Sequence, residues 1–267
     1  MDPYQKPPIA SISDIPVFCS DNEYSENYQT ISEDHLSALE KTGHNPFMDE
    51  ALWQSIEAGT VKLIERHSQG GKILDVGVGT GRLLSRLSSG YEKFGVDISS
   101  AYLGLAAKQG INVCKAFVEE LPYHDNFFDT VVTTDVLEHV LDLNTAVKEI
   151  LRVLKPSGIL IVRVPYRESL RPYLNSNYKF VHLRNFDEDS LTLFFEKIMQ
   201  VKVIEFETCG GLITREHLKE MMPNIFKAAF FLGIHGLKFV SKPLWRKMAD
   251  RFYPHSEINM VVKKICG

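Results

Sequence analysis

The stretch "ILDVGVGTGRLL", residues 73–84, decides how the rest of this chain should fold. Three glycines within five residues follow an apolar run and precede a helical pattern. A short apolar run predicts a buried strand, and glycines at the turn into a helix let a ligand approach the backbone closely. The stretch therefore predicts a binding site. The spacing of its glycines should distinguish a phosphate from a dinucleotide or another ligand.

From residue 71 onward, short apolar runs alternate with helical patterns. Strands are predicted at 72–76, 93–97, 111–116, 128–135, 159–164, 201–207 and 256–265. Helices are predicted at 46–67, 80–88, 144–154 and 187–198, with another that ends at Ala107. Such an alternation predicts a parallel sheet covered on both faces, which binds its ligands beyond the carboxyl ends of the strands.

Composition indicates a soluble, globular, cytoplasmic protein. The 267 residues are 44% hydrophobic and 24% charged, and no apolar run approaches the roughly 20 residues of a membrane span. The start, "MDPYQKPPIASISD", has neither the basic nor the apolar part of a signal peptide. The four cysteines are scattered, which indicates reduced thiols and no metal site. A net charge of -4 argues against a nucleic-acid partner.

The spacing of the glycines narrows the choice of ligand. A nucleoside-triphosphate loop needs GxxxxGK followed by Ser or Thr, which "GVGTGRLL" lacks. In the dinucleotide fingerprint GxGxxG the third glycine comes one residue later, and here Arg82 occupies that place, so a dinucleotide such as NAD is only a remote alternative. Asp75 suits a cationic α-amino group, and Asp97 ends the next strand, where an acid binds a ribose diol. An amino acid joined to a nucleoside fits both carboxylates.

With these features the sequence resembles the class I S-adenosylmethionine-dependent methyltransferases, and among them the small-molecule enzymes of ubiquinone biosynthesis and sugar modification. The resemblance covers roughly residues 70–208 and rests on five motifs in family order: "ILDVGVGTGRLL", "FGVDIS", "EELPYHDNFFDTVV", "DVLEHV" and "ILRVLKPSGILIVRVPY". It implies an α/β, Rossmann-like doubly wound sheet that is mostly parallel with an antiparallel last strand. It also implies S-adenosyl-L-methionine as the cofactor.

The resemblance further implies the cofactor contacts. Asp97 would bind the ribose hydroxyls, and the glycines would lie under the methionine part. Phe117 stands where the family has an acid for the adenine amino group, so either Glu119 replaces that acid or the Val118 backbone holds adenine. From the N-terminal arm, Tyr24 and Tyr28 could close over the cofactor. The expected contacts are Asp75, Gly77, Val78, Gly79, Gly81, Asp97, Ile98, Val118, Glu119, Thr134 and Tyr28.

Candidate catalytic residues follow the fourth and fifth strands. His182 lies in "KFVHLRNFDEDSL", where a histidine in related enzymes faces the substrate; it is either a general base or a loop-holding residue. His139 is a second candidate, with a backbone-satisfied histidine as the alternative. Tyr166 is a weaker one, like Arg167 and Tyr178. No catalytic metal is expected.

Four segments are expected. An N-terminal arm and helix, irregular over 1–30, take up 1–68; the cofactor-binding core takes up 69–209; a helical insertion on the substrate side takes up 210–255; and the last strand takes up 256–267. Residues 1–60 carry eleven acids against two lysines, whereas 224–251 carries six basic residues and one acid. This basic segment could cover the core and pair with the acidic arm, shape a substrate pocket, or, less favoured, rest on a membrane surface.

The sequence thus favours a methyltransferase that acts on a small molecule, with a hydroxyl oxygen of a sugar or secondary metabolite as the acceptor. Two alternatives stay open. The substrate could be lipid-linked, membrane-associated or a protein, or the chain could be a non-catalytic, cofactor-binding partner subunit. The acceptor itself does not follow from the fold, because this fold serves many substrates.

Overall fold

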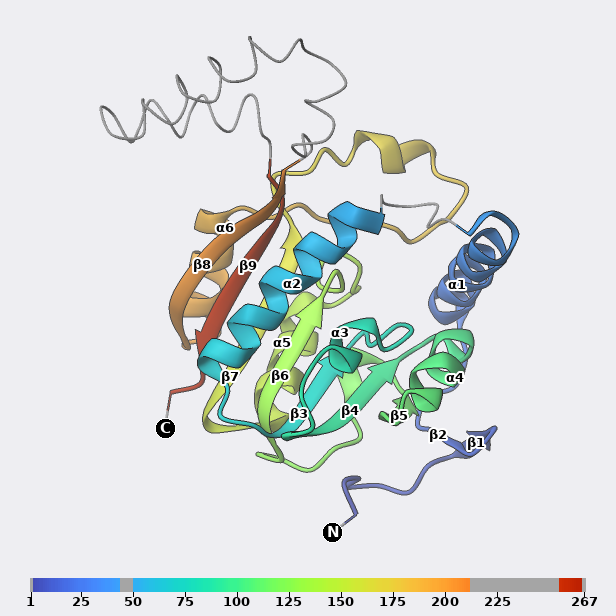
Figure 1. Cartoon of the computed structure of the whole chain (residues 1–267), viewed down its shortest axis with the longest axis horizontal. Helices are drawn as coiled ribbons and strands as arrows, with labels where there is room; N and C mark the ends of the chain where they lie inside the picture. Colours follow the sequence, from blue (N-terminus) through green and yellow to red (C-terminus); the bar gives the residue numbers. More distant parts are fainter. Residues whose placement is uncertain (1, 44–49, 212–254, 266–267) are drawn as a thin grey trace.

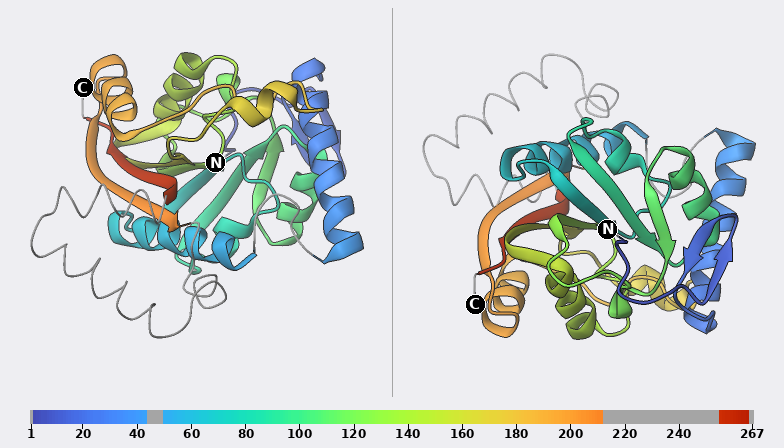
Figure 2. Two further views of the ribbon diagram at one scale, coloured as in Figure 1. Left: turned by 90° about the horizontal axis from the view of Figure 1, so that it is seen from above. Right: turned by 90° about the horizontal axis from the view of Figure 1, so that it is seen from below.

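A computed structural model describes residues 2–43, 50–211 and 255–265 of the chain (Figure 1). The described part forms one nine-stranded sheet with helices on both faces (Figures 1 and 2). The strands are β1 (Ala10–Ile12), β2 (Ile15–Val17), β3 (Gly71–Val76), β4 (Tyr91–Asp97), β5 (Asn112–Lys115), β6 (Phe128–Thr134), β7 (Leu154–Pro165), β8 (Lys202–Gly211) and β9 (His255–Lys263). The α-helices are α1 (Glu23–Thr42), α2 (Glu50–His67), α3 (Arg82–Ser85), α4 (Ser100–Lys108), α5 (Leu143–Val153) and α6 (Glu188–Thr192). The helical turns of other types are η1 (Val118–Glu120), η2 (Arg171–Asn175) and η3 (Leu193–Ile198).

The strand order is β1-β2-β5-β4-β3-β6-β7-β9-β8. Strands β3, β4, β5, β6 and β7 run parallel, whereas β9 is antiparallel to both of its neighbours, β7 and β8. The order reverses at β3, because β4 lies on one side of it and β6 on the other. This confirms the predicted mostly parallel, doubly wound sheet with an antiparallel last strand, and it puts the glycine turn after β3 at the reversal point, where such sheets bind ligands.

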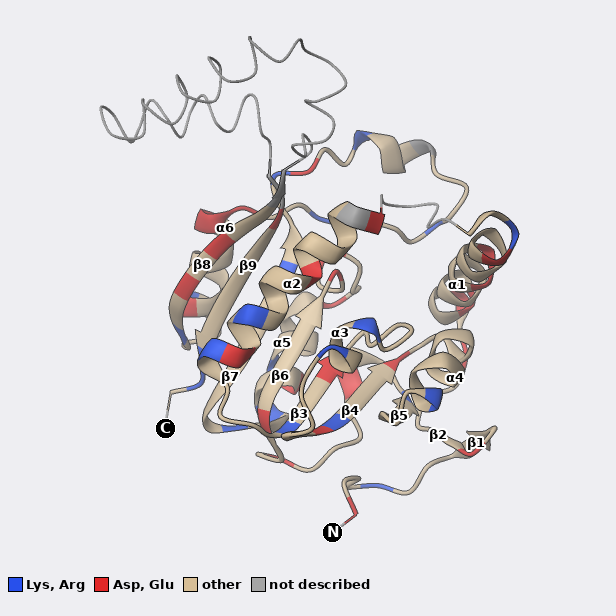
Figure 3. Ribbon diagram, viewed as in Figure 1, with Lys and Arg blue, Asp and Glu red and all other residues tan. Residues whose placement is uncertain are grey.

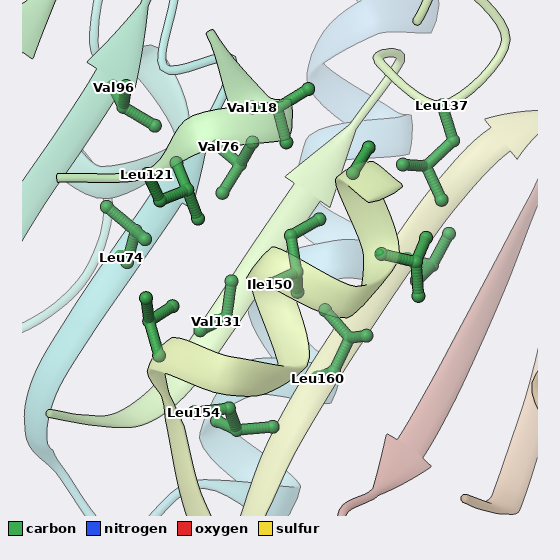
Figure 4. Close-up of a cluster of buried hydrophobic side chains, with 14 of the residues drawn as sticks. Leu74, Val76, Val96, Val118, Leu121, Val131, Leu137, Ile150, Leu154 and Leu160 are labelled. Carbon is green, nitrogen blue, oxygen red and sulfur yellow. The ribbon is translucent and has the colours of Figure 1, made fainter. Parts of the chain in front are cut away.

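Alternate residues of the strands pack into two separate layers of core. Ile73, Val132 and Ile161 pack with α2, α3 and α4, while their sequence neighbours Leu74 and Val131 pack with α5 on the opposite face. Figure 4 shows part of the second layer, where Leu74 and Val131 lie with residues of α5 and β7. Because both faces are buried, the strands read as continuous apolar runs, which is why the sequence located them.

The N-terminal segment differs from the irregular arm that was expected over residues 1–30. It forms the hairpin β1–β2, of which β2 extends the sheet beside β5, and then the 20-residue helix α1. Ile15 and Val17 are buried in the hairpin. The Asn22 side chain caps α1 by accepting a hydrogen bond from the Ser25 backbone N–H, and the Ser25 hydroxyl accepts one from the Asn22 backbone N–H. Local apolar and capping residues therefore give this segment regular secondary structure, although its proline and acid content predicted an irregular arm.

Acidic side chains dominate α1 (Figure 3). The helix carries five acids and one lysine, and the acids lie on its exposed side. The expected partner of this charge, the basic segment 224–251, and most of the insertion predicted at 210–255 lie outside the described residues. No helix among those the structure describes combines the length and the apolar character needed to cross a bilayer.

Candidate active site

A cavity of about 840 Å³ lies beyond the carboxyl ends of β3, β4, β6 and β7. Helices α1 and α2 and the loop 166–182 form the rest of its wall. Its size is in the upper part of the range of small-molecule sites. It is lined by nearly all the candidate residues from the sequence, namely Tyr28, Asp75, Gly77, Val78, Gly79, Asp97, Ile98, Val118, Glu119, Thr134, His139, Tyr166 and His182.

The glycine turn is shaped by close packing on two sides. Gly77 has a φ of 79°, and a Cβ added there would overlap Cγ2 of Val136. Gly81 does not line the cavity; a Cβ there would lie 2.7 Å from Ile111 Cδ1 and 3.2 Å from Ala106, so this glycine lets α3 pack against the α4 layer. Gly77 and Gly81 therefore have different reasons to lack a side chain.

Asp97 holds the turns that follow β3 and β4. Its carboxylate accepts hydrogen bonds from the backbone N–H of Gly79 at 2.9 Å and of Ser99 at 2.9 Å. Burial raises the pKa of Asp97, while the backbone donors of Ser99, Gly79 and Ile98 act in the opposite direction. The carboxylate is thus both a support of the glycine turn and part of the cavity wall.

Asp75 is a buried carboxyl at the end of β3, with a side chain that is 2% exposed. Its Oδ1 has no hydrogen-bond partner among the described residues. Burial raises the pKa of Asp75 well above its usual value, and only the guanidinium of Arg163 opposes that shift appreciably. A buried, unpartnered carboxyl oxygen beside a cavity is suited to a cationic ligand group.

Helix α1 forms a roof that spans the cavity. Ser32 Oγ is 2.6 Å from Ser99 Oγ at the start of α4, and the Asn27 amide donates to the carbonyl of Phe180 at 2.9 Å. Tyr24 and Tyr28 line the cavity from this helix, as the sequence had suggested. The roof therefore contacts both the β4–α4 turn and the loop 166–182.

The opposite end of the cavity holds two histidines side by side. The rings of His139 and His182 are 4.6 Å apart, and the Tyr28 ring is 5.5 Å from that of His139. Burial, together with the neighbouring His182, lowers the pKa of His139 to about 4, so this imidazole is neutral at physiological pH. Tyr166 also lines this end, at the end of β7.

His182 is backed by Glu168, which accepts a hydrogen bond from its Nδ1. Tyr173 donates to the same carboxylate at 2.5 Å. Burial alone would raise the pKa of Glu168, but the hydrogen bonds from His182 and Tyr173 outweigh it and lower the pKa. An ionised Glu168 holds the Nδ1–H of His182, so the Nε2 of His182 is the atom left to act on a substrate.

Buried carboxyls surround Arg163 near the histidines. Arg163 is 2% exposed and donates to Asp135 Oδ2 at 2.6 Å and to Thr60 Oγ1 at 3.2 Å. Glu138 and Glu257, which are 1% and 4% exposed, also line the cavity. Burial raises the pKa of both glutamates well above the usual value, and the charge of Asp135 adds to it. The cavity thus has a strongly acidic end.

Comparison with known proteins agrees with this geometry. Residues 74–162 match the family described as "Methyltransferase domain". The chain is 28% identical over 179 residues to the ubiquinone/menaquinone biosynthesis C-methyltransferase UbiE of Desulfotalea psychrophila, covering 64% of this chain and 69% of that protein. The chain carries a class I S-adenosylmethionine-dependent methyltransferase domain.

Two further likenesses bound what can be said of the whole protein. Protein MJ1123 of Methanocaldococcus jannaschii is 37% identical over 109 residues, which are 41% of this chain and 52% of that protein. The alignment thus spans only about half the length of that relative. A SAM-dependent methyltransferase structure from Thermotoga maritima superposes with a TM-score of 0.57 at 20% identity, over 90% of this chain and 99% of that one. This likeness shows the fold of the methyltransferase domain.

Sequence reasoning missed four functional candidates of the methyltransferase domain. Arg163 lies between apolar residues of β7 and Glu257 lies just before the apolar run of β9, and these charges at buried strand positions were the available signal. Glu138 lies beside His139 in the quoted motif "DVLEHV", and Glu168 lies two residues after Tyr166. The expectation of no metal rested on spacing along the chain, whereas the fold brings Glu138, His139 and His182 together in space.

Replacing Glu257 with Gln is expected to make the stability of the ligand-free protein less dependent on pH. A carboxyl whose pKa is raised by folding keeps its proton in the folded protein while the unfolded chain ionises, so the stability of the wild type falls as the pH rises above about 4. Asp135, Glu138 and Arg163 are the charged groups that face Glu257. The variant should gain about 1–3 kcal/mol relative to wild type between pH 5 and pH 8. Urea unfolding at both pH values measures the gain, and an unchanged difference between the two proteins would contradict the expected titration.

Proposed function

We propose that this protein transfers the methyl group of S-adenosylmethionine to a hydroxyl oxygen of a small molecule. The observation that carries the proposal is a single cavity lined at one end by the glycine turn and Asp97 and at the other by His139 and His182. A cavity of about 840 Å³ has room for a cofactor and a small acceptor together. Methyl transfer needs that proximity, because donor and acceptor must be aligned and water excluded.

The residues at the cofactor end fit S-adenosylmethionine. Asp75 offers an unpartnered, buried carboxyl oxygen to an α-amino group, and Gly79 in the turn after β3 lines the cavity with open space where a side chain would be. Asp97 is the group for the ribose hydroxyls, since its carboxylate lies at the end of β4 in the cavity wall. Ile98 and Val118 offer apolar contact to adenine, and Glu119 lies beside them for its amino group.

The residues at the acceptor end fit the removal of a hydroxyl proton. Bound S-adenosylmethionine supplies a sulfonium methyl group, and the sulfur keeps the electron pair of the broken C–S bond. His182 has its Nδ1–H held by Glu168, so its Nε2 is available to accept the acceptor's proton. His139 stands beside it as a neutral imidazole, and Tyr166 completes the wall that keeps the acceptor in place.

Replacing Asp97 with Ala is expected to weaken the binding of S-adenosylhomocysteine about 10- to 100-fold, which corresponds to about 1.5–3 kcal/mol for hydrogen bonds to a charged group. Isothermal titration calorimetry at neutral pH measures the change. Asp125→Ala is the matched control, because Asp125 is an exposed aspartate paired with Arg152 just before β6, away from the cavity. Equal affinity in the wild type and the Asp97 variant would contradict the ribose role.

The acceptor class is tested by product analysis. The protein is incubated with methyl-labelled S-adenosylmethionine and a panel of small hydroxyl-bearing compounds, and the labelled products are identified by mass spectrometry. An O-methyl product that disappears in His182→Gln supports the proposal. The relative UbiE is named a C-methyltransferase, so a carbon acceptor is the second candidate, and label found only on carbon would replace the oxygen acceptor.

A further inference from the structure

We propose that Glu138, His139 and His182 form a binding site for a divalent transition-metal ion at the acceptor end of the cavity. One ligand atom from each of the three side chains lies within 4.8 Å of the other two. Nitrogen and carboxylate ligands bind zinc at about 2.0–2.2 Å in tetrahedral geometry, so two ligand atoms of one ion are about 3.4 Å apart, which small side-chain movements would reach here. The three side chains are thus close to the spacing that one shared ion requires.

His139 is oriented as a ligand by a backbone carbonyl. Its Nδ1 lies 3.1 Å from the carbonyl oxygen of Val181 and must donate to it, because a carbonyl only accepts. The lone pair is therefore on Nε2, which lies 3.8 Å from Oε1 of Glu138. A histidine that binds a metal through one nitrogen and donates from the other to a carbonyl or carboxylate is the usual arrangement at metal sites.

His182 is oriented in the same way by a carboxylate. Its Nδ1 donates to Glu168, which is itself held by the hydroxyl of Tyr173. This fixes the Nε2 of His182 as the second lone pair. The two rings are 4.6 Å apart with an interplanar angle of 74°. The Nδ1 of each imidazole is engaged in a hydrogen bond, so the two Nε2 lone pairs remain for one shared partner.

Glu138 supplies the charge and the clearest sign of a missing partner. Its side chain is 1% exposed, and neither carboxylate oxygen has a hydrogen-bond partner in the part of the chain that the structure describes. A buried carboxylate without partners is costly, by several kcal/mol in general. An ion bound to Glu138 would remove that cost. His139 does not remove it, because it makes no hydrogen bond to Glu138, and water does not, because Glu138 is buried.

The donor set favours a metal ion over an organic ammonium group. Two imidazole nitrogens with one carboxylate suit zinc, cobalt, nickel, manganese and iron in their divalent states, whereas calcium and magnesium prefer oxygen ligands. Three protein ligands leave at least one coordination position for a substrate oxygen, as in catalytic zinc sites.

For its part in methyl transfer, the inference rests on the proposed function. With an ion in place, His139 and His182 hold the ion instead of receiving the acceptor's proton. The ion then favours the ionised form of a hydroxyl placed beside it, and the proton is released to water. The bond changes at carbon, oxygen and sulfur are otherwise those given above. Binding of the ion itself does not depend on the methyl-transfer reaction.

Metal binding by the full-length protein tests the proposal. The protein is dialysed against a chelator and titrated with Zn²⁺ by calorimetry and with Co²⁺ by visible absorption, which reports imidazole and carboxylate ligation. We expect one ion per chain, and a loss of affinity of about 100-fold or more in Glu138→Gln and His182→Gln. Glu168→Gln should lose about 10- to 100-fold, because it orients His182 without binding the ion.

Glu257→Gln is the matched control, since it removes a second buried carboxylate of the same cavity that is not part of the three-residue set. It should keep wild-type affinity for the metal. S-adenosylhomocysteine binding is measured on every variant, which shows that each is folded and tests the cofactor site separately. Absence of stoichiometric binding to the wild type, or wild-type affinity in Glu138→Gln, overturns the metal site even if the cofactor binds. Metal binding without cofactor binding would instead overturn the proposed function alone.

Discussion

Gly77→Ala is expected to destabilise the protein by about 2–5 kcal/mol and to abolish measurable binding of S-adenosylhomocysteine. A left-handed φ costs a non-glycine residue about 1–2 kcal/mol, and overpacking a dense site costs about 1–3 kcal/mol more. The φ of Gly77 is 79°, and the new methyl group would overlap Val136 Cγ2 at the turn after β3. Denaturant unfolding and calorimetry measure the two effects.

Two variants separate the causes. Gly79→Ala has the same kind of backbone angle, with a φ of 51°, but an added Cβ would meet no atom within 4 Å, so it should cost only about 1–2 kcal/mol. The pair Gly77→Ala and Val136→Ala removes the overlapping methyl group and should recover part of the loss. An equal cost at Gly77 and Gly79, with no coupling between Gly77 and Val136, would show that packing against Val136 is unimportant.

Arg163→Met is expected to destabilise the protein by about 3–5 kcal/mol at neutral pH, the usual effect of removing one partner of a buried ion pair. Arg163 is 2% exposed, pairs with Asp135 and opposes the raised pKa of Asp75 and Glu257. Without the guanidinium these carboxyls either stay charged without compensation or take up protons. The loss should therefore be smaller at pH 5 than at pH 8, as urea unfolding would show.

Arg66→Met is the matched control for Arg163. Arg66 also pairs with one carboxylate, that of Glu205, but its side chain is 52% exposed. Exposed ion pairs contribute about 0–1 kcal/mol, so this variant should be nearly as stable as wild type. Adding Glu257→Gln to Arg163→Met should restore part of the stability. Arginine variants of equal stability would indicate that the acidic end of the cavity is well hydrated.

The strands could be predicted because strands buried on both faces consist of continuous apolar residues, which are visible in the sequence. Ile73 and Leu74 point into opposite core layers, so both must be apolar, and the same holds for Val131 and Val132. Helix α1 could not be predicted in this way. Its inner side is held largely by polar contacts, such as Ser32 with Ser99, and its exposed side is acidic, so the helical apolar stripe is weak.

The two ends of the cavity also differed in how well the sequence predicted them. The cofactor end follows from local sequence, because Asp75 at the end of β3 is followed directly by the glycine turn. The acceptor end depends on the loop 166–182 folding back onto the end of β6, where the Leu183 N–H donates to the Glu138 carbonyl at 2.8 Å. No local sequence pattern predicts that Glu168, His182 and Glu138 lie close together in the fold.

The roof helix α1 provides a physical connection between the proposed cofactor position and the proposed acceptor position. Ser32 of this helix contacts Ser99, two residues after Asp97, and Asn27 donates to Phe180 in the loop that carries His182. A rigid helix held at both places cannot shift for one ligand without changing the fit of the other. At the proposed cofactor and acceptor positions we therefore expect the two affinities to be thermodynamically linked. The linkage would be reciprocal, so that the bound acceptor raises or lowers cofactor affinity by the same factor by which the bound cofactor changes acceptor affinity.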